Sequence, residues 1–340
     1  MMKPSGIRST WVAGAIVALL VFAAAAVPFI GRQAAGSTIL LHARMAEDGG
    51  WTPASLQAQA GQPLHLRLTS DDVMHSFAIG QSEMAPVDVA PGEVTVLTLT
   101  FDKPGKYTYY CTRWCGPNHW RMRGVIEVSG PDNADQPPEP PLYVTLGLDI
   151  DQPHPAAVTP AAPPSVVRGE ELIAQVPSAS LLSEYTTKDY SRTHSPAETW
   201  QALRAEASLE GFSDQQLWDL AAALVQSQTT PEMLSEGRRL YAENCAACHG
   251  ENGAGDGVMA ESLASEPMPG MDPGQMTTAP ADFSDPGSML GASPAVLNGK
   301  IVRGGMGTGM PYWGPIFTGE QIWALVAYIQ SLQFETENQP

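Results

Sequence analysis

Cysteine is scarce in this chain: only 4 of its 340 residues are cysteines, and they lie in two short motifs. Cys111 and Cys115 form the first pair, and Cys245 and Cys248 form the second. No further cysteine is available for a structural disulfide, so each pair has to be understood together with the residues around it. A chain of this length is also too long for one compact domain, which predicts a modular protein.

Basic residues are few as well. The chain has 18 Lys and Arg against 36 Asp and Glu, a formal net charge of −18. This excess of negative charge argues against a nucleic-acid partner and against binding to an anionic membrane surface, and leaves solubility or a basic partner as its explanation. Signatures of catalysis are also lacking, since no nucleophile with a base, phosphate-binding loop or pair of carboxylates stands out. We therefore predict no catalytic residue on this chain.

Charge is absent altogether from residues 11–30, which follow Lys3 and Arg8. An apolar run of this length can span the hydrocarbon core of a bilayer. We predict that residues 1–36 form one uncleaved membrane anchor with its N-terminus inside, because positive residues favour the cytoplasmic side. A secretory signal peptide is the alternative, since the small residues at 24–26 can form a cleavage site.

Soft metal ligands are concentrated in one short segment. Two cysteines, a histidine and a methionine lie close together as Cys111, Cys115, His119 and Met122, and His75 lies upstream after an extended run. Thiolate, imidazole and thioether groups together favour copper. One cysteine would be enough for a mononuclear blue-copper site, whereas a second thiolate allows two sulfurs to bridge a pair of copper ions.

Two simpler interpretations of this segment remain open. Cys111 and Cys115 can form a disulfide, or the two cysteines and two histidines can bind zinc tetrahedrally. Neither interpretation uses Met122. Copper is therefore the interpretation that accounts for more of the residues.

From Ser37 to about Gly130 the chain resembles the binuclear copper (CuA) domain of cytochrome c oxidase subunit II. The resemblance includes the segment before His75 and the Pro-Gly turn at Pro91. It implies two bridging ligands, two terminal ligands and two weak axial ligands. By this resemblance Cys111 and Cys115 are the bridging ligands, and His75 and His119 are the terminal ligands. Met122 and the backbone carbonyl of Arg113 are the axial ligands.

The same segment carries the pattern of an all-β domain. Residues 64–69, 94–101 and 125–128 alternate or are rich in β-branched side chains, and Pro-Gly and Asn turns separate them. Such spacing is typical of a Greek-key sandwich. We predict a cupredoxin-like domain over residues 37–130, with its metal loop before the last strand.

The chain departs from the family pattern at two places. Many members have a glutamate at the position of Arg113, and its carboxylate helps to hold a magnesium ion, which an arginine cannot do. The aromatic cluster that receives electrons from external cytochrome c is also missing, since only Trp51 is aromatic in that region. Direct electron entry at the copper face is therefore not expected.

A second redox motif follows in the sequence. Cys245, Cys248 and His249 form Cys-x-x-Cys-His, which predicts covalent attachment of a c-type haem with His249 as the proximal ligand. The glycine-rich residues 250–257 strengthen this prediction. Haem attachment of this kind indicates an oxidising compartment outside the cytoplasm.

A sixth iron ligand is expected in a glycine-rich loop near the C-terminus, which contains Met306 and Met310. Similar class I cytochromes c place the axial methionine directly before a proline, and this favours Met310. Met306 remains the alternative. We predict a class I cytochrome c domain over residues 229–335.

Two segments separate the predicted domains. Residues 131–165 are dense in proline and alanine and predict a linker, with at most a short strand at 142–148. Within the predicted helical module at 166–228, residues 212–224 repeat the pattern of residues 317–329, each starting with a capping box. The module is therefore either a cytochrome-like unit that has lost its haem or an unrelated amphipathic helix bundle.

The sequence thus predicts a multi-domain electron carrier: a transmembrane helix, an all-β cupredoxin-like sandwich and an all-α cytochrome c domain. Both cofactors, binuclear copper and haem c, perform one-electron chemistry. The resemblance implies a periplasmic respiratory subunit that passes electrons from cytochrome c or a cytochrome bc-type complex to the catalytic subunit I of an oxidase. The alternatives are subunit II of a CuA-type nitric oxide reductase and a free-standing membrane-anchored carrier.

Overall fold

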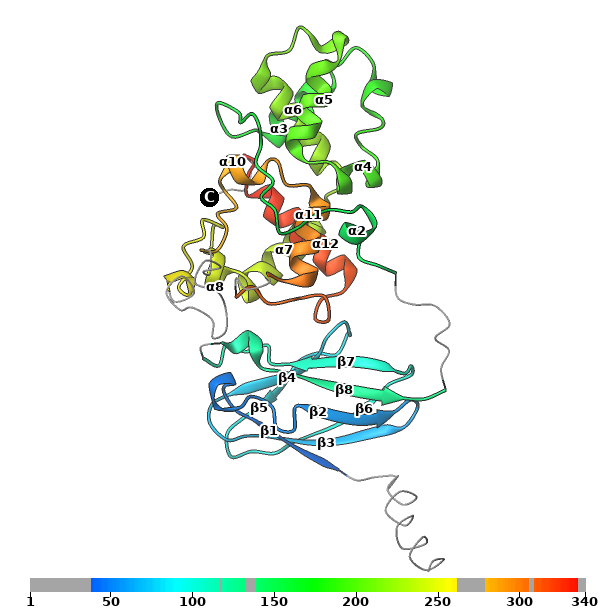
Figure 1. Ribbon diagram of the computed structural model, residues 1–340, viewed down its shortest axis with the longest axis vertical. Helices are drawn as coiled ribbons and strands as arrows, with labels where there is room; N and C mark the ends of the chain where they lie inside the picture. Colours follow the sequence, from blue (N-terminus) through cyan, green and yellow to red (C-terminus); the bar gives the residue numbers. More distant parts are fainter. Residues whose placement is uncertain (1–37, 117, 132–138, 262–278, 306–308, 336–340) are drawn as a thin grey trace, which may run out of the picture. The chain divides into compact units, whose positions relative to one another are not determined.

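The computed structural model describes residues 38–116, 118–131, 139–261, 279–305 and 309–335 (Figure 1). The predicted anchor at 1–36 lies outside these residues. Within the described ranges no helix is long and apolar enough to cross a membrane. The chain divides into two compact units, one made only of residues from the β-rich part and the other containing the whole helical part.

The β-rich part forms two sheets. One has three strands in the order β1-β3-β6, and the other has five in the order β2-β8-β7-β4-β5. The strands are β1 (Ile39–Ala43), β2 (Ser55–Gln59), β3 (Pro63–Ser70), β4 (His75–Ile79), β5 (Val87–Val89), β6 (Thr95–Thr100), β7 (Gly105–Tyr110) and β8 (Arg123–Ser129). The predicted all-β cupredoxin-like domain is confirmed.

Alternation along β3 shows why this sequence forms a sandwich. Leu64, Leu66 and Leu68 are buried, whereas Arg67 between them is exposed. Each strand residue points to the face opposite its neighbour, so the leucines all enter the space between the sheets. Burying one such side chain fully contributes roughly 1.5–3 kcal/mol, which makes this face the main source of stability for the strand.

The helical part consists of short helices and has two hydrophobic cores. One core is formed mainly by residues 166–228, the middle half, and the other mainly by residues 229–335, the C-terminal half. The α-helices are α2 (Leu142–Thr145), α3 (Val166–Ile173), α4 (Lys188–Thr193), α5 (Pro196–Ala205), α6 (Asp214–Gln226), α7 (Pro231–Asn244), α8 (Ala246–His249), α10 (Pro286–Met289), α11 (Pro294–Arg303) and α12 (Gly319–Ser331). Both predicted capping boxes are present, at the starts of α6 and α12.

The segment predicted as a linker is helical at 142–145, so the short strand allowed at 142–148 was wrong. The segment also packs on α11. Tyr143 lies against Gly299, where a side chain on the glycine would collide with its ring. Asp151 forms a bidentate ion pair with Arg303. These contacts order a proline-rich stretch that has little apolar surface of its own.

In the C-terminal half, α7 packs against α12 around a glycine. A Cβ atom on Gly237 would collide with the backbone oxygen of Ala324 and the Cβ atom of Tyr328. The absence of a side chain therefore sets how closely the two helices approach. One turn further along α7, Leu240 is buried in the same core.

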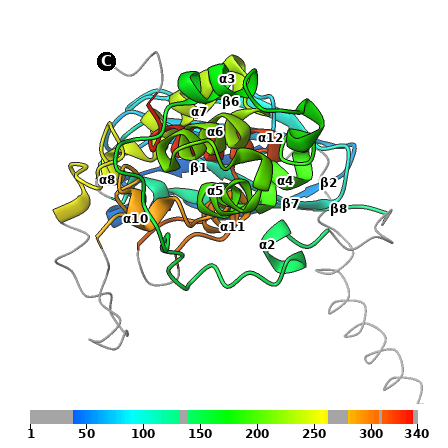
Figure 2. The same cartoon turned by 90° about the horizontal axis from the view of Figure 1, so that it is seen from above.

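The pair α3 and α6 repeats this contact in the middle half, where α3 and α5 both lie against α6 (Figure 2). A Cβ atom on Gly169 would collide with the backbone oxygen of Asp219 and the Cβ atom of Ala223. When the repeated segments at 212–224 and 317–329 are aligned, Asp219 falls on Ala324 and Ala223 on Tyr328. The two helix pairs therefore make the same glycine contact at equivalent positions.

The middle half has no haem ligands at the equivalent positions. Alignment on the two glycines places Pro177, Ser180 and Leu181 where the second half has the Cys-x-x-Cys-His motif. The core is filled instead by aromatic side chains, with the rings of Trp200 and Trp218 stacked 5.0 Å apart. Both tryptophans are buried.

Candidate copper centre and haem-binding site

Three predicted copper ligands converge at one end of the sandwich. His75 begins β4, and Cys111 and Cys115 lie in the loop after β7. One ligand atom from each of the three lies within 4.8 Å of the others. All three side chains are buried, with His75 fully inaccessible to solvent. Cys111 and Cys115 form no disulfide in the structure, which does not support the disulfide alternative.

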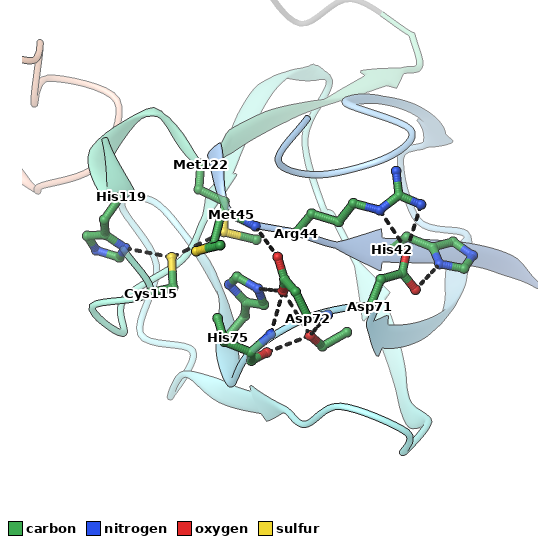
Figure 3. Close-up of polar contacts among 11 residues, drawn as sticks. His42, Arg44, Met45, Asp71, Asp72, His75, Cys115, His119 and Met122 are labelled. Atoms are coloured by element: carbon green, nitrogen blue, oxygen red, sulfur yellow. Dashed lines mark hydrogen bonds and ion pairs between the residues drawn. The ribbon is translucent and has the colours of Figure 1, made fainter. Parts of the chain in front are cut away.

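The imidazole of His75 is oriented by a carboxylate that sequence reasoning did not assign. Its Nε2 atom lies 2.7 Å from Oδ1 of Asp72 (Figure 3). Because the carboxylate accepts, Nε2 carries the proton and Nδ1 is left with its lone pair for a metal. The only sequence signal for this role is the position of Asp72 three residues before the histidine.

Asp72 is itself held in place by backbone donors. Its carboxylate accepts hydrogen bonds from the N–H groups of Met45 and Val73, both at 2.6 Å. Burial would raise the pKa of Asp72, but the hydrogen bonds from His75, Met45 and Val73 hold it below its ordinary value. The group therefore stays an anion that polarises the histidine.

The other two predicted side-chain ligands surround Cys115. Nδ1 of His119 lies 3.3 Å from Sγ of Cys115, and Sδ of Met122 lies 3.7 Å from the same sulfur. Nδ1 of His119 thus faces the thiol of Cys115. Met122 is almost completely buried, as a thioether that faces a metal rather than solvent would be.

Three contacts with residues outside the loop hold it in place. The guanidinium of Arg113 forms two hydrogen bonds of 2.8 Å with the carboxylate of Asp88. The indole N–H of Trp51 donates to the backbone oxygen of Met122 at 3.3 Å. Asn118, at the loop's left-handed position, donates to Glu47. Nothing in the sequence indicated that Asp88, Asn118 and Glu47 make these contacts.

His75 and the two cysteines therefore form one cluster, and His119 and Met122 each contact Cys115 at its edge. A tetrahedral zinc ion would use four of these groups and leave the thioether of Met122 without a role. Soft sulfur ligands together with imidazole fit copper. The carbonyl of Arg113 belongs to the same loop, and its ligand role stays a prediction.

The haem motif lies where α7 ends. Cys245 caps α7, and Cys248 and His249 lie on α8. Nδ1 of His249 donates to the backbone oxygen of Ala281 at 3.1 Å, which leaves Nε2 free to face an iron ion. The imidazole also stacks on Phe283, with ring centroids 4.4 Å apart.

Burial sets the protonation of this motif. It lowers the pKa of His249, against the opposing hydrogen bond to Ala281, and so favours the neutral imidazole that a metal requires. Burial also raises the pKa of the Cys245 thiol to about 12. Before haem attachment this thiol is therefore protonated at neutral pH.

The glycine-rich segment after His249 turns the chain back on itself. Gly250, Gly253 and Gly255 all have positive φ angles, which only glycine adopts easily. The hydroxyl of buried Tyr241 donates to the backbone oxygen of Gly250 at 2.8 Å. The loop is thus tied to α7 beside the attachment motif.

Met310 is half-buried and packs against the core of the C-terminal half. Its backbone oxygen accepts a hydrogen bond of 3.1 Å from the N–H of Gly305. Met306, the alternative iron ligand, lies outside the described residues. The choice of Met310 stays a prediction.

Comparison with known proteins agrees with this division. The cytochrome c family matches residues 234–333, and the cupredoxin-like domain family matches residues 13–126. These matches define a chain that combines a cupredoxin-like domain with a cytochrome c domain. The two domains imply the two predicted cofactors, copper and haem c.

The chain is similar to cytochrome c oxidase subunit 2 of Thermus thermophilus. It is 35% identical over 79 residues, which is 23% of this chain and 58% of that protein. A second subunit 2 sequence from the same species matches at 35% over 79 residues, or 46% of its length. The chain thus spans about half the length of these curated relatives. The predicted resemblance to subunit II with a fused cytochrome c domain is confirmed.

Among solved structures, the chain is similar to the periplasmic domain of subunit II of cytochrome oxidase (CoxB) of Bradyrhizobium japonicum. The identity is 19%, with 28% of this chain and 86% of that chain covered, and the TM-score is 0.25.

Proposed function

We propose that this protein is the electron-entry subunit of a haem–copper terminal oxidase. Electrons pass from a donor through haem c and the copper pair to the catalytic subunit that reduces oxygen to water. One observation carries the proposal: the chain holds both sets of one-electron ligands, at His75 with its two cysteines and at the Cys-x-x-Cys-His motif. Copper and haem supply reversible one-electron chemistry, and the protein supplies orientation and potential.

The protein residues perform three tasks in this proposal. Asp72 fixes which nitrogen of His75 faces the metal, and Ala281 does the same for His249. Burial of the two loop cysteines excludes water from the thiolates. The ion pair between Arg113 and Asp88 holds the ligand loop, so that little reorganisation accompanies electron transfer.

Residues 1–36 serve in this proposal as a single membrane anchor, with both redox domains on the periplasmic side of the cytoplasmic membrane. The partners are catalytic subunit I in the membrane and an upstream donor, either cytochrome c or a cytochrome bc-type complex. The net charge of −18 suits a basic donor and disfavours nucleic acid.

A second function is subunit II of a CuA-type nitric oxide reductase. Arg113 favours it, because this residue cannot bind the magnesium ion that many oxidase members hold at the subunit interface. The catalytic subunit encoded beside this gene distinguishes the two. A free-standing carrier is the third possibility, and purification from membranes without a haem–copper subunit would support it.

Electron paramagnetic resonance of the oxidised protein tests the copper assignment. We expect a delocalised two-copper signal that disappears in Cys115→Ser, because one bridging thiolate is lost. Cys248→Ser is the matched control, since it disturbs haem attachment and should keep the copper signal. A mononuclear copper signal in the unchanged protein would refute the pair.

We also propose that the module at 166–228 is a cytochrome-like unit without haem that acts as a scaffold. The equivalent contacts of Gly169 and Gly237 support this origin. So does the stacked pair Trp200 and Trp218, which fills the core that contains no haem ligands.

A further inference from the structure

A cavity of about 390 Å³ lies in the helical part, away from both metal-binding motifs. Residues of α4, α6, α7, α11 and α12 and of the chain directly after α6 line it. Its volume falls within the range of about 300–1,000 Å³ that is usual for small-molecule sites. Trp323, Val326 and Met233 form an apolar part of its wall.

Two cations from one helix face this cavity. Lys188 and Arg192 are one turn apart on α4, and neither forms an ion pair with a carboxylate within the part of the chain that the structure describes. Glu320 is the one acidic residue in the lining, and Asp189 lies beside Arg192 on the same helix. Burial lowers the pKa of Arg192, and the charge of Asp189 only partly opposes this. An anion in the cavity would stabilise the guanidinium.

Arg192 is positioned to accept such an anion in a defined way. Its guanidinium lies over the ring of Trp323, with its central carbon 4.1 Å from the ring centroid. This cation–π contact holds the guanidinium in place and does not use its N–H groups, which remain available to an acceptor.

A buried amide supplies an independent indication of a ligand. Gln330 also lines the cavity and is only 4% exposed, yet its Nε2 atom has no hydrogen-bond partner among the described residues. A buried donor without an acceptor is destabilising. A rotation of this side chain toward the cavity that it lines would allow a ligand oxygen to accept a hydrogen bond from Nε2.

We propose that this cavity binds a small carboxylate with an apolar body. The carboxylate pairs with Arg192 and Lys188, Gln330 donates to one of its oxygens, and the apolar body packs against Trp323 and Met233. The site is independent of the proposed electron relay, because none of its residues belongs to either metal-binding motif.

Thermal shift and calorimetry on the full holoprotein test the proposal, with hydrocinnamate as the probe. We expect hydrocinnamate to raise Tm and the uncharged hydrocinnamamide to leave it unchanged. Phenyl phosphate distinguishes the anion: stronger binding of phenyl phosphate than of hydrocinnamate would overturn the carboxylate assignment. Absence of hydrocinnamate binding would overturn the proposal as a whole.

Variants locate the binding. Arg192→Gln should weaken hydrocinnamate at least about tenfold, because a charge-assisted contact is lost. Arg204→Gln is the matched control, since Arg204 also lies over a tryptophan ring, that of Trp200, but does not line the cavity. Equal loss in both variants would contradict the site.

Gln330→Leu gives a second test that does not depend on charge. Removing an unpaired buried amide should raise the Tm of the ligand-free protein, while affinity for hydrocinnamate falls at least about tenfold. A purely structural role predicts the first effect without the second, so unchanged affinity would count against the proposal. The haem absorption spectrum checks that the cytochrome domain remains intact.

Discussion

Two adjacent aspartates show how much a single position decides in this protein. Asp71 binds His42 and Arg44 at the surface, whereas Asp72 binds the predicted copper ligand His75. In the sequence the two carboxylates differ only in their distance from His75, which is four residues for Asp71 and three for Asp72. The strand and loop geometry around β4 directs one outward and the other toward the metal centre.

Asp72→Asn should weaken copper binding by about 10–100-fold, because the imidazole of His75 loses the anion that raises its basicity. Competition with a chelator measures the affinity. Asp71→Asn is the control with the same chemical change and should leave copper affinity unaltered. Equal affinity in the two variants would exclude the orienting role of Asp72.

Met310→Ala tests the axial iron ligand. We expect loss of the sulfur-to-iron absorption band of the oxidised haem, because no thioether then reaches the iron. Met306→Ala serves as the comparison and should retain the band. If Met306→Ala removes the band and Met310→Ala does not, Met306 is the ligand.

At the scale of elements, glycines decide how the helices pair. The amphipathic patterns of α6 and α12 and their capping boxes were predictable from sequence, because capping and periodicity are local. The glycine contacts were not, because they join residues far apart in the chain. The steric requirement for glycine at positions 169 and 237 becomes evident only when the partner helix is in place.

Gly237→Ala should lower the free energy of unfolding by about 1–3 kcal/mol, because the added methyl group overlaps the backbone of α12. Gly169→Ala should behave similarly against α6. Gly211→Ala is the control, since a Cβ atom there meets nothing within 4 Å. Chemical denaturation measures all three. A Gly237→Ala protein as stable as Gly211→Ala would show that the helices do not require this close approach.

At the scale of the whole molecule, the order of the two redox centres is the central prediction. Removing copper with Cys111→Ser should leave reduction of haem c by a donor intact and stop oxygen consumption by the assembled complex. Rapid-mixing spectroscopy follows the haem, and an oxygen electrode follows turnover. Continued oxygen consumption would show that electrons bypass the copper pair.

The sequence alone predicted the two cofactor classes, the division into an all-β and an all-α part, and the candidate ligands. This was possible because the spacing of ligand residues and the periodicity of side chains are local properties. Only the tertiary structure showed which other residues orient those ligands or hold their loops by hydrogen bonds. Asp72, Asp88 and Ala281 act through contacts across loops and strands. Such contacts depend on which distant segments pack together, and the free energy that selects that packing comes from burial over the whole domain.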